Sequence, residues 1–284
     1  MAADTRRLEN RTSLVLAVAP NGARKTHNDH PQLPITPSEL ADCAAACREM
    51  GASMLHLHVR DAVGRHSLAI ADYRAALAAV RRAIGQSLVI QVTSESVGKY
   101  TSAAQIAMIR ELRPEAVSIA LRELLAGDAE EIEVAAFLAW AHREHIVIQF
   151  ILYDIGDIRR YIDLRKRGII AASQHWVLFV LGRYSGGDSS LSDLLPMIGL
   201  WSAHQGAIGD VPWAVCAFGR REIECGLGAA ALGGHVRIGF ENNVYLPDGR
   251  LAKDNSELIG CFANIAKDLG YCLADATSLR AAFA

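Results

Sequence analysis

The chain has 284 residues, of which 51% are hydrophobic and 6% aromatic, so it can bury a large aliphatic core. That length exceeds an ordinary domain but suits a single α/β barrel. With 29 basic and 31 acidic residues, the charge balance excludes an extended surface for nucleic acid or anionic membranes. A charged ligand must therefore be met by local charges.

Targeting and redox signals are few. No stretch holds the ~20 consecutive apolar residues of a membrane span, and the first ten residues, MAADTRRLEN, lack the apolar core of a signal peptide. None of the six cysteines forms a CxxC pair, which favours reduced thiols. Cys43 and Cys47 lie one helical turn apart and could share a ligand, but small buried thiols are the simpler interpretation. We expect a soluble, cytoplasmic protein.

Short apolar runs rich in β-branched residues recur along the chain and predict eight strands. Their near-continuous apolarity is typical of parallel strands that are covered on both faces. The predicted strands span 13–19, 54–59, 88–93, 116–121, 146–152, 175–181, 213–218 and 235–240.

The segments between these runs carry helix signals. In TPSEL, Thr36 is the predicted N-cap, Pro37 occupies the first helical position, and Glu39 completes a capping box. DAEE (128–131) repeats this pattern, and DYRAALAAVRRAIG (72–85) is an amphipathic helix closed by glycine.

Eight strands that each precede a helix, with no Pro/Gly/Ser-rich linker, predict an α/β fold: one (β/α)8 TIM barrel that forms a single domain over residues 1–284. A doubly wound open sheet is the alternative, which the even spacing disfavours. No G-x-G-x-x-G or Walker-type loop is present. The glycine-rich LGRYSGGDSS (181–190), which ends at a predicted helix N-cap, could cradle a phosphate or could be a flexible turn.

The second predicted strand contains two histidines, in SMLHLHVRD (53–61). Because side chains alternate along a strand, Leu55, Leu57 and Val59 should face the helices, while His56 and His58 face the barrel axis. His58 lies near the C-terminal end of the strand, where barrel enzymes keep their active sites. Two inward imidazoles there have the arrangement of metal ligands, although a lone buried histidine would more simply be a core residue.

A carboxylate completes the set at the end of the eighth strand, in GGHVRIGFENN. Alternation places Arg237 and Glu241 on the inner face, and strands eight, one and two are neighbours in a closed barrel. Glu241 can therefore approach His56 and His58, and two histidines with one carboxylate form a common catalytic zinc set. An inward Arg237 needs a partner, which could be Glu241, another acid or an anionic substrate.

Metal-dependent amidohydrolases also carry an H-x-H motif on a barrel strand. They place it on the first strand, with further histidines after strands five and six. Here the motif is on the second strand, the fifth ends in QFILYD without a histidine, and His175 begins the sixth. The positions exclude that interpretation.

Taken together, the motifs resemble the β-keto acid cleavage enzymes over nearly the whole chain. The matching stretches are NGARKTHNDHPQLPITPSEL, HLHVRDAVGRHS, FVLG, WAVCAFGR and GGHVRIGFENN, in this order. The resemblance implies a zinc-dependent (β/α)8 barrel, usually a homotetramer. Such an enzyme condenses a β-keto acid with acetyl-CoA and releases acetoacetate and a new acyl-CoA. It also implies that His56, His58 and Glu241 bind Zn²⁺, that Arg237 helps to activate the substrate, and that the Thr93 hydroxyl contacts it.

The chain departs from the family at a proton-transfer position. The family usually has an Asp after the zinc-binding Glu, whereas Asn242 stands here, and an amide has no useful basicity. Glu95 occupies a position where the family has glycine, at the mouth of the barrel. We therefore keep Asn242 as a catalytic candidate beside Arg237 and Thr93, and add Glu95 as a replacement acid. The alternative for Glu95 is a solvated loop carboxylate.

Other departures concern the substrate. On strand four, Ser118 keeps a hydroxyl that can bind substrate, but Ala120 and Arg122 differ from the family, and on strand five Gln149 replaces a Glu. Arg24 stands where the family member that accepts an amino-bearing substrate has a Glu. An arginine there suits a distal carboxylate, which predicts a dicarboxylic β-keto acid such as 3-oxoglutarate or 3-oxoadipate. The neighbouring lysine at position 25 could be only a solvated charge.

Two other functions remain open at this point. One is enolate chemistry without CoA, of the aldol or decarboxylative type, which the loss of the Asp at position 242 supports. The other is a non-catalytic barrel that binds zinc and an anion. Dependence on acetyl-CoA distinguishes the first from the leading prediction, and any turnover excludes the second.

Overall fold

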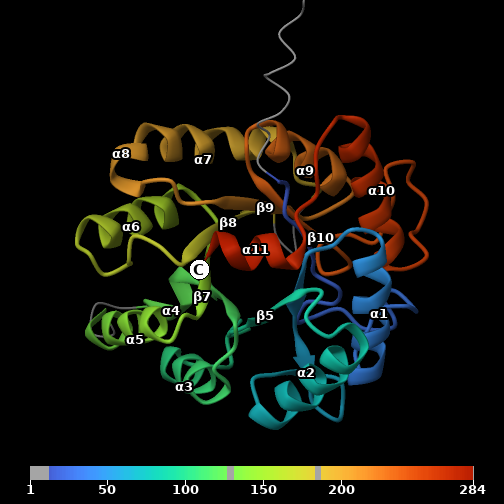
Figure 1. The fold of residues 1–284 in the computed structure, drawn as a ribbon, viewed down its shortest axis with the longest axis horizontal. Helices are drawn as coiled ribbons and strands as arrows, with labels where there is room; N and C mark the ends of the chain where they lie inside the picture. The colour runs from blue at the N-terminus through green and yellow to red at the C-terminus, as the bar shows by residue number, and fades with distance from the viewer. Residues whose placement is uncertain (1–12, 127–130, 183–186, 284) are drawn as a thin grey trace, which may run out of the picture.

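The computed structural model describes residues 13–126, 131–182 and 187–283. Eight parallel strands form a closed barrel in the order β1-β10-β9-β8-β7-β6-β5-β2, and helices surround it (Figure 1). The predicted (β/α)8 barrel is confirmed, and the open doubly wound sheet is excluded by the closure of the sheet. The barrel strands are β1 (Leu16–Val18), β2 (Met54–Leu57), β5 (Val89–Thr93), β6 (Ala116–Ala120), β7 (Val147–Leu152), β8 (His175–Leu181), β9 (Trp213–Ala217) and β10 (His235–Ile238).

The second predicted strand differs from the expectation at its C-terminal end. Barrel pairing stops at Leu57, and Val59–Arg60 forms β3, which pairs antiparallel with β4 (His66–Ser67). This hairpin was not predicted, because the apolar alternation that marks the barrel strand continues through residue 59. The eighth strand also ends early, because Gly239 has a φ of +147° and a side chain there would meet the carbonyl oxygen of Ala19.

Helix α1 begins where its capping signal predicts. Thr36 accepts a hydrogen bond from the Glu39 amide, and the Glu39 carboxylate accepts one from the Thr36 amide. Gly85, with a φ of +56°, ends α2. The box predicted at 128–131 and the glycine-rich stretch 181–190 fall partly outside the described residues, and residues 1–12 fall wholly outside them.

Described helices vary from a single turn to four turns. None of them is long and apolar enough to cross a bilayer. They are α1 (Pro37–Glu49), α2 (Ile70–Ile84), α3 (Ser102–Leu112), α4 (Leu121–Leu124), α5 (Glu131–Arg143), α6 (Ile155–Lys166), α7 (Leu191–Ala203), α8 (Gln205–Ile208), α9 (Glu222–Ala231), α10 (Asn255–Asp268) and α11 (Ala276–Ala282).

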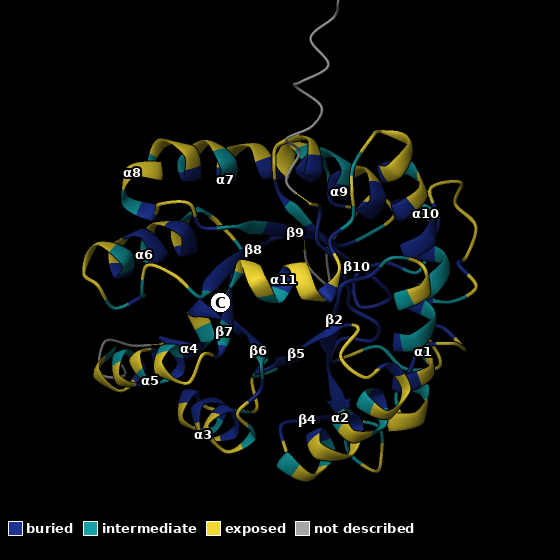
Figure 2. Ribbon diagram, viewed as in Figure 1, coloured by how far each residue is buried: buried dark blue, intermediate teal, exposed yellow. Residues whose placement is uncertain are grey.

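The core has two layers, as the alternation along the strands predicts. Leu55 and Leu57 belong to the layer between barrel and helices, whereas Met54 packs inside the barrel with Trp176. The strands are buried and the outer faces of the helices are exposed (Figure 2). Helix α11 crosses the N-terminal end of the barrel, where the rings of Phe283 and Trp176 lie 5.7 Å apart. The opposite end, at the C-termini of the strands, holds the inward histidines.

Candidate active site

Two histidines and one carboxylate meet at the C-terminal end of the barrel. His56 lies on β2, His58 follows that strand, and Glu241 follows β10, with β1 between the two strands. The Nε2 atoms of the two histidines are 3.0 Å apart, and they lie 3.5 Å and 3.4 Å from Oε2 of Glu241. All three side chains are buried. The juxtaposition predicted from the strand order is therefore present.

These three atoms fit a divalent metal. In a tetrahedral site with bonds of about 2.0–2.1 Å, neighbouring ligand atoms are about 3.3 Å apart. The observed separations of 3.0, 3.4 and 3.5 Å bracket that value. Oε2 of Glu241 is buried and accepts no hydrogen bond from the described residues. A cation between the three atoms would satisfy it and would leave one side of the site open to a ligand.

The orientation of His56 is set from the neighbouring strand. Its Nδ1 lies 2.8 Å from Oε1 of Gln91, and the Gln91 amide nitrogen donates to Oε1 of Gln149 at 3.2 Å. An amide oxygen can only accept, so Nδ1 carries the proton and Nε2 presents its lone pair to the site. Gln91 was missed in the sequence, although inward alternation between Val89 and Thr93 marks its position. Gln149, noted only as a departure, holds Gln91 in place.

Arg237 is the cation that stabilises the buried carboxylate. Its Nη2 donates to Oε1 of Glu241 at 3.0 Å and to Sγ of Cys216 at 3.2 Å, so Glu241 is the predicted partner. Burial alone would raise the pKa of Glu241, but Arg237 and the two histidines outweigh it and hold that pKa well below its ordinary value. Burial, with Arg237 nearby, holds the pKa of His56 well below its ordinary value, so the imidazole is neutral, as a metal ligand must be.

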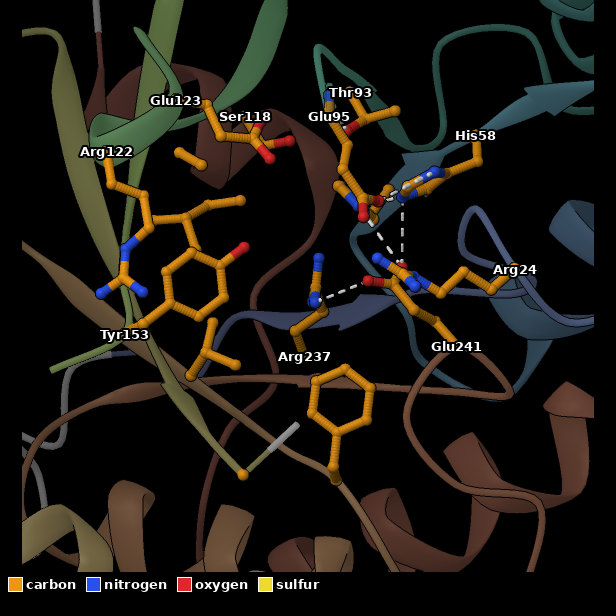
Figure 3. Close-up of a pocket in the computed structure, with 16 residues that line it drawn as sticks. Arg24, His58, Thr93, Glu95, Ser118, Arg122, Glu123, Tyr153, Arg237 and Glu241 are labelled. Atoms are coloured by element: carbon orange, nitrogen blue, oxygen red, sulfur yellow. Dashed lines mark hydrogen bonds and ion pairs between the residues drawn. The ribbon is translucent and has the colours of Figure 1, made fainter. Parts of the chain in front are cut away.

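The triad opens into a cavity of about 310 Å³ at the mouth of the barrel (Figure 3). His58, Glu241, Glu95 and Arg24 lie on one side of it, and Ser118, Glu123, Arg122 and Tyr153 lie on the other. Apolar side chains also line the cavity: Ile151, Val180 and Phe218. The cavity therefore offers polar groups on two sides together with apolar lining.

Glu95 points into this cavity rather than into solvent. Its side chain is 18% exposed, and Oε2 lies 3.8 Å from Nδ1 of His58. Burial raises the pKa of Glu95, with help from Glu241 and Glu123, against the opposing effects of His58 and Arg24. The alternative of a solvated loop carboxylate is wrong.

Two hydroxyl groups line the cavity as the sequence predicted. Oγ of Ser118 is buried and has no hydrogen-bond partner among the described residues, so it is available to a ligand. Oγ1 of Thr93 accepts a hydrogen bond from the Glu95 amide at 3.1 Å, which leaves its own proton free to be donated.

Arg24 and Lys25 differ in their surroundings. Arg24 lines the cavity at its rim. Nζ of Lys25 instead donates to the carbonyl oxygen of Phe240 at 2.7 Å, and burial lowers its pKa against the attraction of Glu222 and Glu241. Lys25 is therefore a structural contact next to the triad, and the interpretation as a solvated charge is wrong.

Asn242 is placed differently from the other catalytic candidates. It is 4% exposed and does not belong to the described lining of the cavity. Neither atom of its side-chain amide has a hydrogen-bond partner within the described residues. The side chain thus does not line the space where a substrate would sit.

On the far side of the cavity only Ser118 was predicted as a site residue. Arg122 donates to Asp157 at 2.5 Å and to Asp154 at 2.6 Å, and its guanidinium lies 4.6 Å from the centre of the Tyr153 ring. Burial raises the pKa of Tyr153, so its phenol stays protonated and can donate. The sequence signals were that both residues follow a predicted strand and that Arg122 departs from the family pattern.

Comparison with known proteins is consistent with this arrangement. A family model described as beta-keto acid cleavage enzyme matches residues 13–284. The 3-keto-5-aminohexanoate cleavage enzyme of Fusobacterium nucleatum subsp. nucleatum is 30% identical over 262 residues, covering 90% of this chain and 92% of that protein. The 3-oxoadipate:acetyl-CoA acetyltransferase of Cupriavidus necator is 24% identical over 280 residues, covering 94% of this chain and 93% of that protein.

Solved structures share the fold. The apo structure of ObcA superposes with a TM-score of 0.67 at 16% identity, and the match covers 89% of this chain and 65% of that chain. At such low identity the likeness concerns the fold alone. The family model, by contrast, spans nearly the whole sequence, and the chain belongs to the beta-keto acid cleavage enzyme family.

Proposed function

We propose that this protein is a zinc-dependent β-keto acid cleavage enzyme that condenses a β-keto acid with acetyl-CoA and releases acetoacetate and a new acyl-CoA. The observation that carries the proposal is the buried triad of His56, His58 and Glu241, backed by Arg237, at the open end of the barrel. Two imidazole nitrogens and one carboxylate oxygen are a ligand set that suits Zn²⁺ with an open position.

His56, His58 and Glu241 would hold the metal. When bound there, Zn²⁺ supplies a Lewis acid that polarises the carbonyl group of the keto acid. Arg237 keeps Glu241 ionised and places a fixed positive charge at the base of the cavity, where negative charge develops on the substrate. Ser118 and Thr93 donate hydrogen bonds that hold the substrate against this charge.

Glu95 is our candidate for the group that moves the proton. It lines the cavity beside the triad, and burial raises its pKa toward the range in which a carboxylate is an effective base. It removes a proton from the carbon between the carbonyl and carboxylate groups of the keto acid. The resulting carbanion attacks the thioester carbon of acetyl-CoA and displaces the CoA thiolate. The thiolate then adds to the original keto carbonyl, and the bond from that carbon to the acylated carbon breaks. The new acyl-CoA leaves, and the acetoacetate carbanion takes back the proton held by Glu95.

The substrate class follows from Arg24. Its guanidinium at the rim suits a distal carboxylate through paired hydrogen bonds, which favours a dicarboxylic β-keto acid. The Cupriavidus relative is named for 3-oxoadipate, a substrate of that class. Arg122, which also lines the cavity, pairs with two aspartates and is less suited to bind the distal group.

A second function has one observation in its favour. Asn242 replaces the acid that the family uses in proton transfer, and its amide lies outside the cavity. If Glu95 does not replace that acid, the same site would run enolate chemistry without CoA, or would bind zinc and an anion without turnover. From the family resemblance we also propose a single-domain homotetramer located in the cytoplasm.

Acetoacetate release tests the proposal. Purified, zinc-loaded protein is given acetyl-CoA with neutral, cationic and dicarboxylic β-keto acids in turn. We expect turnover with the dicarboxylic substrates and none without acetyl-CoA. Keto acid consumption that needs no acetyl-CoA would support the second function, and no turnover at full zinc occupancy would leave only binding.

A further inference from the structure

The hairpin of β3 and β4 has no part in the function described so far, although its sequence, RDAVGRHS, is one of the stretches that resemble the family. Arg60 on β3 lies directly opposite His66 on β4. The turn between them is held by Asp61, whose Oδ1 accepts the backbone N–H groups of Val63 at 3.0 Å and Arg65 at 2.9 Å. Strand pairing and this turn therefore hold Arg60 and His66 opposite each other.

The Arg60 side chain forms hydrogen bonds with the segment that carries Arg24. It is 8% exposed, and its guanidinium donates to the carbonyl oxygens of Ala23 at 2.8 Å, Gly22 at 2.5 Å and Lys25 at 3.0 Å. These three carbonyls flank Arg24 on both sides. A planar guanidinium with several donors fixes such a backbone segment more firmly than a single donor can.

The His66 side chain forms a hydrogen bond with the segment that carries Glu95. Its Nε2 lies 2.9 Å from the carbonyl oxygen of Glu95, and since a carbonyl can only accept, Nε2 carries the proton. On the other side of the same residue, Thr93 accepts the Glu95 amide at 3.1 Å. The backbone of Glu95 is therefore held at both its N–H and its carbonyl group.

We propose that the cross-strand pair of Arg60 and His66 is a bracket that sets the separation between Arg24 and Glu95. This inference rests on the proposed function, in which Arg24 binds the distal carboxylate and Glu95 moves the proton. Neither bracket residue belongs to the described cavity lining, so both are positioning residues. A substrate must place its distal group and its reacting carbon at the same time, and a misplacement of about 1 Å can cost about 100-fold in rate.

Hydrogen–deuterium exchange tests the bracket without relying on activity. We expect Arg60→Met to speed amide exchange in residues 22–25 and His66→Leu to speed it in residues 94–96, each leaving the other segment unchanged. Arg65→Met is the matched control, because Arg65 lies on the same hairpin and its side chain is 76% exposed. Unchanged exchange in both segments would overturn the bracket. If Arg60→Met does not fold, Arg60→Lys, which keeps the charge but has fewer donors, gives the same comparison.

Steady-state kinetics test what the bracket does. Arg60→Met should lower the preference for dicarboxylic over neutral substrates about tenfold, through KM, and should have no further effect in an Arg24→Ala background. His66→Leu should lower kcat about tenfold with no further effect in a Glu95→Gln background, and His66→Gln, which keeps an N–H donor, should recover most of it. Additive double variants would overturn the bracket. Should Arg24→Ala and Glu95→Gln alone change nothing while exchange responds, the proposed roles of Arg24 and Glu95 fail and the bracket stands.

Discussion

The Arg237 guanidinium donates to Oε1 of Glu241 at 3.0 Å, while Oε2 of the same carboxylate faces the two histidines. One carboxylate is thus shared between a buried cation and the candidate metal ligands. This sharing keeps Glu241 ionised in a buried position, where an isolated carboxylate would be costly. It also means that Glu241 has two separable sets of contacts, Oε2 with the histidines and Oε1 with Arg237.

The first prediction concerns the metal. His58→Ala and Glu241→Ala should each lose bound zinc, measured by elemental analysis after dialysis, while the far-ultraviolet circular dichroism spectrum persists. Glu241→Ala should also lower the free energy of unfolding by about 3 kcal/mol, because it leaves Arg237 buried without its carboxylate. Glu123→Gln, in the same cavity but outside the triad, is the control and should keep its zinc. Full zinc in either alanine variant would remove that residue from the ligand set.

The second prediction concerns substrate charge. Arg24→Glu should lower kcat/KM for a dicarboxylic β-keto acid about 100-fold or more, since it replaces an attractive charge with a repulsive one at the cavity rim. The same variant should raise kcat/KM for a cationic substrate. Arg65→Glu changes the net charge equally at an exposed position and should alter neither value. An unchanged preference in Arg24→Glu would refute the role of Arg24.

The third prediction concerns proton transfer. Glu95→Gln should lower kcat by about 10²- to 10⁴-fold, because the amide keeps the shape but cannot accept the proton. KM and zinc content should change little, since Glu95 lies outside the triad. Glu123→Gln again serves as the control, because Glu123 lines the far side of the same cavity. Near-normal kcat in Glu95→Gln would mean that another group moves the proton.

The fourth prediction concerns stability in acid. Burial lowers the pKa of His175 to about 4, and its Nε2 lies 2.7 Å from the hydroxyl of Tyr161. Between the unfolded value of about 6.5 and the folded value, the unfolded chain binds more protons, so the free energy of unfolding falls as the pH falls through this window. At pH 5 this difference in proton binding by His175 lowers the free energy of unfolding by about 2 kcal/mol, and near pH 7 the effect is close to zero.

Urea unfolding at pH 7 and pH 5 measures this effect. In His175→Gln, the loss of stability between the two pH values should be about 2 kcal/mol smaller than in the unaltered protein. The exposed His27 provides the control, and His27→Gln should show the same loss as the unaltered protein. An equal loss of stability between pH 7 and pH 5 in all three proteins would mean that His175 is already protonated in the folded state at pH 5.

Much of the fold and the centre of the site could be predicted from sequence. The strands, the capping box at Thr36 and the inward direction of His56 and His58 depend on local periodicity and capping, which a short window of sequence contains. Glu241 could be added because chain order alone makes the last and first strands of a closed barrel neighbours. These conclusions needed no knowledge of individual contacts.

The tertiary structure decided which polar groups share one cavity. The β3–β4 hairpin, the support of His56 by Gln91 and the exclusion of Asn242 from the cavity lining all depend on contacts between segments far apart in the chain. Glu95 illustrates the difference, since its sequence position allowed both a solvated loop and a site residue. Only the packing of neighbouring strands buries it beside His58 and raises its pKa. Periodicity determines which way a side chain points, whereas burial and charge partners come from the assembled barrel.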